Sequence, residues 1–348
     1  MVESLDRKVI LVGTYMNAQQ EALQVLSLEP DGQLRQLNQV TGIDSPSYLA
    51  LTNDKHYLYA VSEVEDGAVV SYSFNAQTGD LKELNRQLTQ GAMPCFVSID
   101  NHEKKLFVAN YMGGSVCAYP IEADGSIGAL ADRVKHSSHS IHGGRQEAAH
   151  PHAIVTVPGT NERLVTDLGT DHLYIYRNET PNSSWVLHDE IDAVPGSGPR
   201  HIAFHPNKPF IYVIQELNST IALYHRDEAG HFTLIETVST LPKGFQDENT
   251  AAHIQVSANG DYLYASNRGH DSIVSYRIGE KGTLDCIGYT STLGKTPRHF
   301  LLVHESSYML VANQDSDSII VMSISQEGLP VSTGLSYAIE SPVCLVEA

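Results

Sequence analysis

A unit of three short strand-like runs recurs along the whole length of the 348-residue chain. Its clearest copy covers residues 198–224, where apolar runs at 202–204, 210–215 and 220–224 are separated by turns that contain Pro, Gly or Asn. Runs of this length, rich in β-branched and aromatic residues and bounded by such turn residues, are typical of β-strands. Self-similarity of this kind constrains the fold more than any other feature of a sequence.

Each copy begins at a recurring turn, here called the leading turn, which contains a proline in six of the seven copies. The leading turns fall at positions 46, 94, 151, 199, 251, 297 and 342, so that successive copies are 45 to 57 residues apart. The second run of several copies ends in Asn, as at 106–110, 262–267 and 309–313. This spacing is close to the length of a four-stranded propeller blade.

The repeat predicts an all-β fold, a seven-bladed β-propeller with four-stranded antiparallel blades. The fourth strand of a blade is expected after a small polar turn, at 34–39, 81–87, 232–238 and 284–290. The last leading strand, 343–346, has no chain left to supply its partners, whereas the runs 9–12 and 23–28 have no leading strand before them. We therefore expect the N-terminal strands to complete the blade that the C-terminal strand begins, which closes the ring and pairs edges that would otherwise be exposed. Seven units fill the chain, so a single domain, 1–348, is expected.

The composition narrows the range of partners. A formal net charge of −19 argues against nucleic acid, whose affinity depends on Lys and Arg at phosphates, and against anionic membrane surfaces. No run of 18 apolar residues could span a membrane, and the first eight residues contain no apolar run of signal-peptide length. We expect a cytoplasmic protein that binds neither membranes nor nucleic acid; its oligomeric state is open, and a monomer is plausible.

Two repeat positions carry unexpected charges. The position after the leading proline, the post-proline position, holds Ser47, Cys95, His152, Arg200, Ala252, Arg298 and Val343 in the seven copies. The position at the end of the second strand, the post-strand position, holds Tyr15, Glu63 (or Val64), Tyr111, Leu168, Glu216, Arg268 and Gln314. Charged residues where other copies hold neutral ones depart from the structural rule of the repeat, as functional residues do. We expect the innermost strands to bring the post-proline residues to the channel mouth.

The residue types suggest acid–base chemistry on an anion. Arg200 and Arg268 offer planar forks suited to carboxylate or phosphate, and His152 has the pKa range that serves proton transfer near neutrality. Glu216 could orient a water, act as a base or pair with an arginine. Three further histidines, His201, His253 and His299, share the next repeat position, where a structural hydrogen-bonding role is expected.

Two loops are additional candidates. The loop 136–150 is the longest insertion and carries several histidines, which leaves a metal site and a polar lid over the channel mouth as alternatives. We favour a lid hinged at Gly143 and Gly144, because zinc needs three or four converging ligands and no HExxH spacing is present. The loop 242–249 could overhang the channel through Lys243. No serine-hydrolase elbow, P-loop or dinucleotide fingerprint is present, and no cofactor is expected.

Four motifs carry a resemblance to a known family: His150-Pro-His152, Gly198-Pro-Arg200-His201, Gln215-Glu216-Leu-Asn218 and Ser266-Asn-Arg268-Gly. With the repeat they make the whole chain similar to the seven-bladed β-propeller lactonases, associated in bacteria with 6-phosphogluconolactonase and related to a fungal carboxy-muconate lactonising enzyme. In the muconate relatives one histidine, one glutamate and two arginines are functional. By motif these fall on His152, Glu216, Arg200 and Arg268.

The resemblance implies a lactone hydrolase of carbohydrate metabolism in the pentose phosphate pathway, acting on a small anionic lactone. Its catalytic residues would be His152, Glu216, Arg200 and Arg268. Substrate-binding residues would be Arg298, His150, Lys243 and Asn218. Three alternatives stay open: a cycloisomerase acting on a carboxy-muconate-like acid, a non-catalytic interaction propeller and a metal-dependent enzyme. The interaction propeller is disfavoured by the absence of Trp-Asp dipeptides and by a single tryptophan, Trp185.

Overall fold

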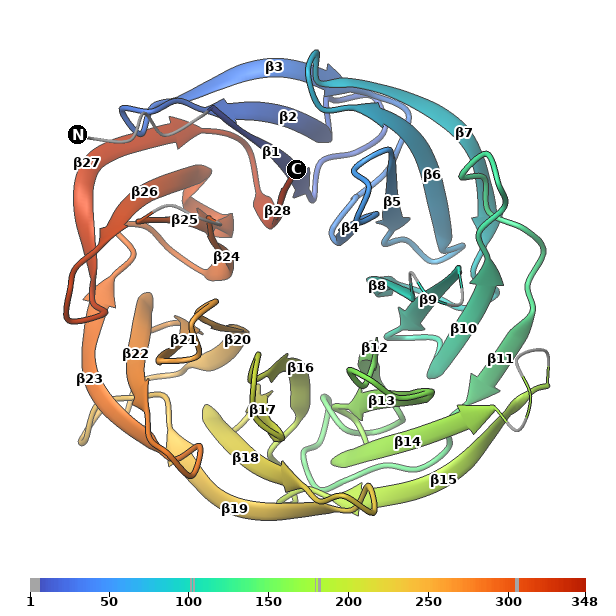
Figure 1. Cartoon of the computed structure of the whole chain (residues 1–348), viewed down its shortest axis with the longest axis vertical. Coiled ribbons are helices and arrows are strands. Elements are labelled where there is room, and N and C mark those ends of the chain that lie inside the picture. Colours follow the sequence, from blue (N-terminus) through green and yellow to red (C-terminus); the bar gives the residue numbers. More distant parts are fainter. Residues whose placement is uncertain (1–6, 101, 103, 179, 181–182, 304–306) are drawn as a thin grey trace. The chain divides into compact units, whose positions relative to one another are not determined.

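Seven four-stranded sheets account for the regular structure of the chain (Figure 1). The computed structural model describes residues 7–100, 102, 104–178, 180, 183–303 and 307–348. Neighbouring strands pair antiparallel, as between Phe210–Gln215 and Thr220–Arg226. The predicted class, a seven-bladed β-propeller with four-stranded antiparallel blades, is confirmed.

The strands are as follows, sheet by sheet. The first sheet contains β28 (Pro342–Glu347), β1 (Lys8–Thr14), β2 (Leu23–Leu28) and β3 (Leu34–Val40). The second sheet contains β4 (Leu49–Leu51), β5 (Tyr57–Ser62), β6 (Ala68–Asn75) and β7 (Asp80–Leu88), the third contains β8 (Pro94–Asp100), β9 (Lys105–Asn110), β10 (Ser115–Pro120) and β11 (Asp132–Lys135), and the fourth contains β12 (Pro151–Thr156), β13 (Glu162–Asp167), β14 (His172–Asn178) and β15 (Trp185–Asp192). The fifth sheet contains β16 (Pro199–Phe204), β17 (Phe210–Gln215), β18 (Thr220–Arg226) and β19 (Phe232–Ser239), the sixth contains β20 (Thr250–Val256), β21 (Tyr262–Arg268), β22 (Ser272–Ile278) and β23 (Leu284–Ser291), and the seventh contains β24 (Pro297–Leu302), β25 (Tyr308–Asn313), β26 (Ser318–Ile324) and β27 (Pro330–Ala338). A single turn of 3-10 helix, Gln314–Ser316, is the only helix among the residues that the structure describes.

The burial of each strand explains its sequence. Second strands such as β17 and β25 are buried on both faces after their first residue, which is why they read as continuous apolar runs. Fourth strands such as β19 are largely exposed and carry mixed residues. The four fourth strands predicted from the sequence agree with β3, β7, β19 and β23 to within one residue at each end.

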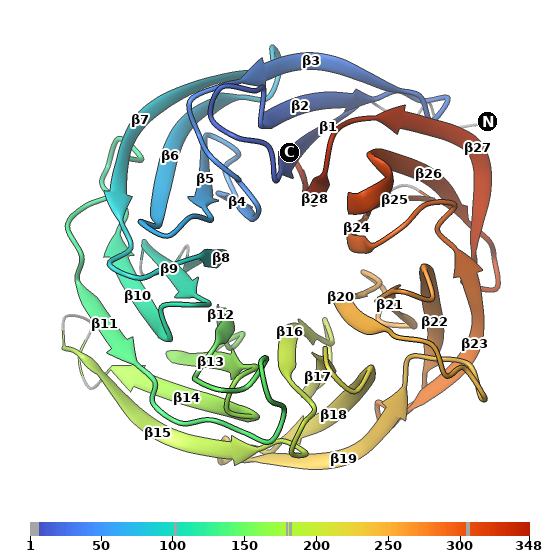
Figure 2. The same cartoon turned by 180° about the vertical axis from the view of Figure 1, so that it is seen from behind.

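The contacts divide the described chain into two compact units. Among the described residues, one contains Arg200–Glu347 with residues 7–8 and Leu28–Arg35, and the other contains Gln36–Pro199 with Val9–Ser27. In the first unit, sheets β16–β19, β20–β23 and β24–β27 follow one another side by side in both views (Figures 1 and 2). An apolar core of residues such as Tyr212, Ile254 and Tyr276 fills the space between neighbouring sheets of this unit.

A polar clasp recurs between neighbouring blades. Asn267 Nδ2 donates to the carbonyl oxygen of Thr240 at 2.7 Å, and Asn313 Nδ2 donates to that of Thr292 at 3.0 Å. Each of these threonines also donates its hydroxyl hydrogen to a carbonyl in the turn after the second strand of its own blade. The Asn that ends these second strands therefore ties one blade to the fourth strand of the blade before it.

A glycine contact repeats at the other end of the blades. Gly282 and Gly328 lie in the turns before fourth strands with φ near +80°, and a Cβ at either would lie within 3 Å of the ring of Phe210 or Tyr262. Both rings begin the second strand of the preceding blade. Only glycine meets both demands, a left-handed turn and a close approach to an aromatic ring.

The two ends of the described chain meet in one sheet, as predicted. β28 pairs with β1 in the order β28-β1-β2-β3. The amide of Ala348 donates to the carbonyl oxygen of Val9 at 2.8 Å, and Lys8 Nζ lies 3.7 Å from Glu347 Oε1. The C-terminal strand thus heads a sheet that the N-terminal strands complete.

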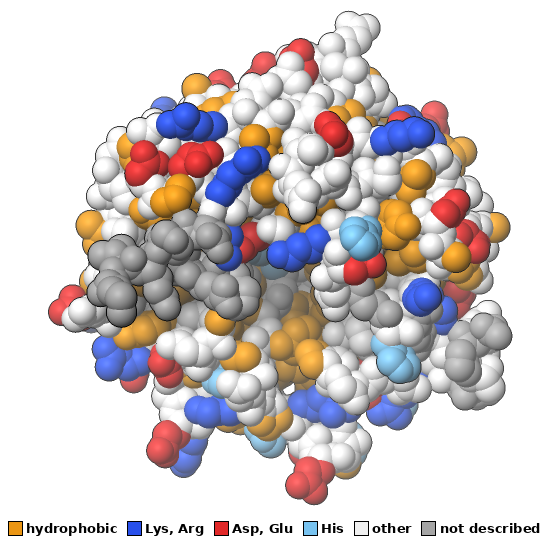
Figure 3. All heavy atoms as spheres, turned by 45° about the horizontal axis from the view of Figure 1, so that its top comes forward, with side chains coloured by type: hydrophobic (Ala, Val, Ile, Leu, Met, Phe, Trp, Pro, Cys, Tyr) orange, Lys and Arg blue, Asp and Glu red, His pale blue; other side chains and the backbone are white. Residues whose placement is uncertain are grey.

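Basic and acidic side chains are interspersed on the face shown in Figure 3. No helix in the described part of the chain is long and apolar enough to cross a membrane. Residues 1–6, on which the expected cytoplasmic location partly depends, lie outside the described residues, and that location stays a prediction.

Candidate active site

A β-bulge re-aims the post-proline residue in several blades. The ladder between the first two strands shifts register between Pro94 and Phe96, between Pro151 and Ala153, between Ala251 and Ile254, and between Pro297 and His299. The residues passed over include Cys95, His152, Ala252 and Arg298. Bulges leave one residue out of the ladder and redirect its side chain, and they occur often beside active sites.

The post-strand and post-proline residues meet in a buried ion-pair triad. Arg200 Nε donates to Glu216 Oε2 at 2.9 Å, and Arg268 Nη2 lies 2.9 Å from the same oxygen. Arg200 is 2% exposed and Glu216 is 3% exposed, while the Arg268 side chain is 12% exposed. One carboxylate with two guanidinium groups leaves the triad with a net positive charge, which suits an anionic ligand or an oxygen on which negative charge develops.

Two backbone carbonyls of β20 hold the two guanidinium groups in place, one in the blade after that of Arg200 and one in the same blade as Arg268. Arg200 Nη1 donates to the carbonyl oxygen of Ala252 at 2.6 Å, and Arg268 Nη2 donates to that of Ala251 at 3.0 Å. Both carbonyls belong to the bulge in β20. The bulge therefore positions the triad although it contributes no side chain to it.

Three histidines, His201, His253 and His299, form a chain of contacts that begins at Arg200. Arg200 Nη1 lies 3.2 Å from both ring nitrogens of His201, whose Nδ1 is 3.0 Å from Nδ1 of His253. The ring of His253 stacks on that of His299 with centroids 3.8 Å apart. Burial, followed by the charge of Arg200, lowers the pKa of His299 to about 3, and burial with the neighbouring His299 and Arg200 lowers the pKa of His253 well below its usual value. These two rings are therefore neutral near pH 7. The contact between His201 and His253 agrees with the hydrogen bonding expected at this repeat position, and a structural role for it stays a prediction.

His152 lies in the second unit in a setting of soft and aromatic groups. Its Nδ1 is 3.8 Å from the thiol sulfur of Cys95, the post-proline residue of the preceding blade. The edge of its ring meets the ring of Tyr111, with centroids 5.7 Å apart. His152 is only 4% exposed. The structure thus joins His152 to the post-proline and post-strand residues of the blade before it.

His150 is a buried member of the same cluster. Its ring stacks on Tyr111 at 4.5 Å and 11°, Nδ1 lies 2.9 Å from the carbonyl oxygen of Tyr111, and Nε2 lies 3.6 Å from Glu147 Oε1. Because a carbonyl can only accept, Nδ1 of His150 is the protonated nitrogen in this contact. His150 supports Tyr111, and its substrate-binding role stays a prediction.

The other predicted binding residues lie on three separate segments. Arg298 is half-buried in the bulge of β24, whereas Lys243 is exposed on the loop 242–249. Asn218 is exposed in the turn after β17, where its Oδ1 accepts a hydrogen bond from Thr220 Oγ1 at 2.7 Å. Their roles as ligand contacts remain predictions.

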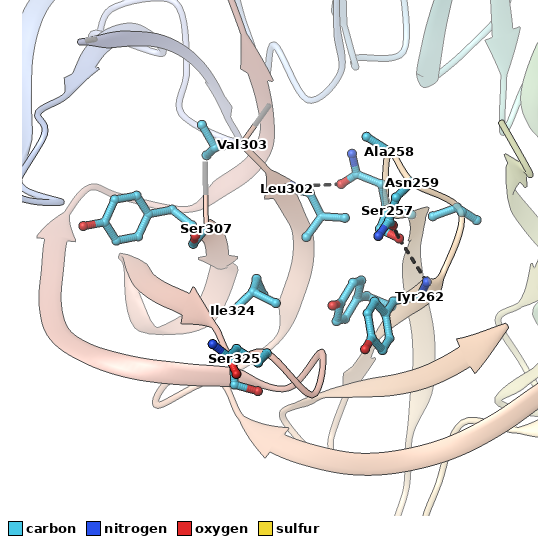
Figure 4. A pocket seen from close by; sticks show the side chains of 14 residues that line it. Ser257, Ala258, Asn259, Tyr262, Leu302, Val303, Ser307, Ile324 and Ser325 are labelled. Carbon is cyan, nitrogen blue, oxygen red and sulfur yellow. Dashed lines mark hydrogen bonds between the residues drawn. The ribbon is translucent and has the colours of Figure 1, made fainter. Parts of the chain in front are cut away.

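A cavity in the first unit is remote from this chemistry. A cavity of about 590 Å³ lies between the blades β20–β23 and β24–β27, lined by residues such as Ser257, Tyr262 and Leu302 (Figure 4). In the β20/β21 ladder, Arg268 pairs with Thr250 at one end, whereas the cavity residues lie at the other end. Ser257 Oγ is already bonded to Asn259 and to the amide of Tyr262 within the turn. The cavity therefore does not house the arginine–glutamate chemistry.

The loop 136–150 is anchored at its stems. His136 and Gln146 are buried, and Ser140 Oγ donates to Asp171 Oδ2 at 2.5 Å. A swing of the whole loop would break these bonds, so the predicted lid motion can apply only to the exposed tip at 141–144. Among the described residues, no group of three or more His, Cys, Asp or Glu side chains converges as a metal site would.

Sequence analysis overlooked several members of these clusters. Cys95 and Tyr111 are neutral members of the two repeat positions, and only charged members were selected. Arg145, whose Nη2 donates to the hydroxyl of Tyr111 at 3.3 Å, lies in the inserted loop and matches no repeat position. The length of that insertion was the one signal that could have drawn attention to it.

Comparison with known proteins gives a consistent result. The family model described as "Lactonase, 7-bladed beta-propeller" matches residues 9–347. A 6-phosphogluconolactonase of Bacillus subtilis is 32% identical over 351 residues, which cover 96% of each chain. A 6-phosphogluconolactonase of Formosa agariphila is 32% identical and covers 83% of this chain and 84% of its own.

A solved structure agrees with these relatives. The periplasmic gluconolactonase PpgL of Pseudomonas aeruginosa superposes with a TM-score of 0.91 at 30% identity, with 99% of each chain covered. The family match spans nearly the whole chain, and the relatives agree with it. The chain belongs to the seven-bladed β-propeller lactonase family.

Proposed function

We propose that the protein hydrolyses the ring ester of an anionic sugar lactone, with 6-phosphogluconolactone as the leading substrate. The observation that carries this proposal is the buried triad in which Arg200 and Arg268 share Glu216 Oε2. Two guanidinium groups held in one place can stabilise the carbonyl oxygen as it becomes an oxyanion. The family membership and the two relatives named 6-phosphogluconolactonase support the reaction class.

In the proposed reaction, a water oxygen attacks the lactone carbonyl carbon and loses a proton to solvent. The tetrahedral oxyanion faces the guanidinium of Arg268. When the bond between the carbonyl carbon and the ring oxygen breaks, the ring oxygen takes a proton from solvent and leaves as a hydroxyl. The product is the open-chain hydroxy acid.

Glu216 is not assigned the proton transfer. Glu216 Oε2 is committed to two guanidinium donors, so we assign the carboxylate to holding them in register. His152 occupies in its blade the same post-proline position that Arg200 occupies in its own. Proton transfer by His152 is a separate proposal, which rests on that equivalence and on the chemistry of imidazole.

The first experiment changes Arg268, which is more exposed than Arg200 and less important for packing. Arg268→Gln should lower kcat/KM for lactone opening by about 100-fold or more, the usual cost of an oxyanion donor. Ring opening is followed by the proton that each product acid releases, after subtraction of spontaneous hydrolysis.

Arg277→Gln is the matched control, because Arg277 is an exposed residue of the adjacent strand β22. The control should retain the parent rate. A parent protein that does not exceed spontaneous hydrolysis, or an Arg268→Gln variant with parent kcat/KM, would refute the proposal.

A further inference from the structure

The bulge in β20 is wider than the bulges of three other blades. Where β8 pairs with β9, β12 with β13 and β24 with β25, one residue is passed over and the ladder resumes at the next residue. Where β20 pairs with β21, the ladder stops at Ala251 and resumes at Ile254. The two residues between them, Ala252 and His253, both lie opposite Ser266. The backbone amide of His253 therefore needs an acceptor outside the regular ladder.

The side chain of Ser266 supplies that acceptor. The amide of His253 donates to Ser266 Oγ at 3.0 Å, and Ser266 is fully buried. The fold does not require a hydroxyl at this place, because Ala109 and Ala312 hold the same repeat position, one residue before the asparagine of the second strand. Ser266 is thus a polar residue at a buried position that two other blades fill with alanine.

A single peptide unit links Ser266 to Arg200. The amide nitrogen of His253 and the carbonyl group of Ala252 belong to the same peptide bond, which is planar and trans, so that its N–H and C=O point to opposite sides. The N–H donates to Ser266 Oγ, and the C=O accepts from Arg200 Nη1 at 2.6 Å. The Ser266 hydroxyl therefore fixes the orientation of the carbonyl that holds the Arg200 guanidinium.

Arg200 passes this constraint on to the other two members of the triad. Its Nε donates to Glu216 Oε2 at 2.9 Å, and Arg268 Nη2 lies 2.9 Å from the same oxygen. A turn of the peptide between Ala252 and His253 would remove the acceptor of Arg200 Nη1. Movement of Arg200 would in turn displace Glu216, the partner that it shares with Arg268. All of these residues belong to the first of the two compact units.

We propose that Ser266 is a positioning residue for lactone opening, which holds Arg200 on Glu216 by fixing the peptide between Ala252 and His253. Ser266 is fully buried and acts through that peptide. Its loss should leave both guanidinium groups in the site but displaced from the developing oxyanion, so that turnover falls while substrate binding changes little. This inference rests on the proposed function, because it concerns the same site.

The test separates kcat from KM and includes a rescue. Ser266→Ala should lower kcat for lactone opening by about 10- to 100-fold and keep KM within about 2-fold of the parent, because small displacements of catalytic groups cost that much. Ser266→Thr should restore kcat to near the parent value, because it keeps the acceptor oxygen. Threonine fits here, since the fully buried Thr166 holds the same repeat position in β13.

Ser275→Ala is the matched control and should retain the parent kcat. Ser275 is a fully buried serine of the neighbouring strand β22, where it lies opposite Tyr264 and away from the bulge. Thermal unfolding checks that each variant folds. If Ser266→Ala does not fold, Ser266→Cys replaces it, because a thiol keeps the side-chain volume and is only a weak acceptor. Parent kcat in Ser266→Ala, or equal loss in the alanine and threonine variants, would refute the inference.

Crystal structures of the parent and of Ser266→Ala give a readout that needs no catalysis. The peptide between Ala252 and His253 should turn in the variant, and Arg200 Nη1 should move beyond about 3.5 Å from the Ala252 carbonyl oxygen. An unmoved peptide with an unmoved Arg200 would overturn the role of Ser266 and leave the proposed hydrolysis intact. A parent protein that opens no lactone would refute the proposed reaction, and the two crystal structures would still decide whether Ser266 orients Arg200.

Discussion

The post-proline and post-strand positions carry different residue types in two blades, although they meet in both. Arg200 and Ser47 are both post-proline residues, and each donates to a glutamate 16 residues later, Glu216 and Glu63 respectively. Glu216 meets a second guanidinium, whereas Glu63 also accepts from the hydroxyl of Tyr15 at 3.1 Å. The fold thus makes these positions meet, and the residue type decides whether the carboxylate meets guanidinium groups or hydroxyl groups.

The buried His299 gives a prediction for acid stability. Its pKa is about 3 in the folded protein and about 6.5 when unfolded, so its contribution to stability is fully present above pH 6.5 and is lost as the pH falls from 6.5 towards 3. His253, whose pKa is also lowered, acts in the same direction. Between pH 6.5 and 3 the unfolded chain binds one more proton at His299 than the folded chain does. The free energy of unfolding then falls by about 1.4 kcal/mol for each such proton and each pH unit.

His299→Asn should therefore show a shallower fall in unfolding free energy between pH 6.5 and 4 than the parent does, by about one proton. Urea unfolding at several pH values measures this slope. Gln36→Ala, a change at an exposed residue that does not titrate, should leave the slope unchanged. An identical slope in parent and His299→Asn would show that this ring is not kept neutral in the folded state.

At the scale of elements, the clasp between blades makes a prediction for stability. Asn313 is fully buried at the end of β25, and it donates to the carbonyl of Thr292. Asn313→Ala should lower the free energy of unfolding by about 1–3 kcal/mol, because a buried carbonyl loses its donor. Denaturant unfolding measures the change. The exposed turn residue Asn259 provides the control, and loss of equal size in Asn259→Ala would mean that the clasp has no special weight.

The strands were predictable and the bulges were not. Strand runs such as 210–215 are marked by apolar patterning and by flanking turn residues, which act locally. A bulge inserts one residue without changing that pattern. The sequences Pro151-His152 and Pro297-Arg298 therefore do not reveal that His152 and Arg298 are unpaired in the strand ladder. The expected alternation of faces in a regular strand therefore misplaces side chains beside the leading turn.

For the whole molecule, the strand that joins the two chain ends is decisive. β28 buries Val343, Cys344 and Leu345 almost completely. Burial of each such side chain contributes about 1.5–3 kcal/mol, so its removal should cost an amount comparable with the entire stability of a typical domain, about 5–15 kcal/mol. Deletion of residues 342–348 should abolish cooperative unfolding, measured by calorimetry or by denaturant.

Glu347→Gln is the control for that deletion, because it removes the ion pair with Lys8 and keeps the strand. The parent should unfold in one transition, in keeping with our proposal that residues 1–348 form a single domain. A deleted chain with the parent midpoint would show that β1–β3 form a stable sheet without their C-terminal partner.

The sequence by itself determined the class of fold, the boundaries of most strands, the pairing of the two chain ends and the identity of Arg200, Glu216 and Arg268 as unusual members of the repeat. These features follow from local patterning and from the comparison of one copy with the next. Only the tertiary structure decided that the two arginines share one oxygen of Glu216, that His136 and Gln146 anchor the inserted loop, and that Arg145 reaches Tyr111. Hydrogen bonds between residues 16 to 52 positions apart depend on bulges and on the packing of neighbouring blades, and no local pattern encodes either.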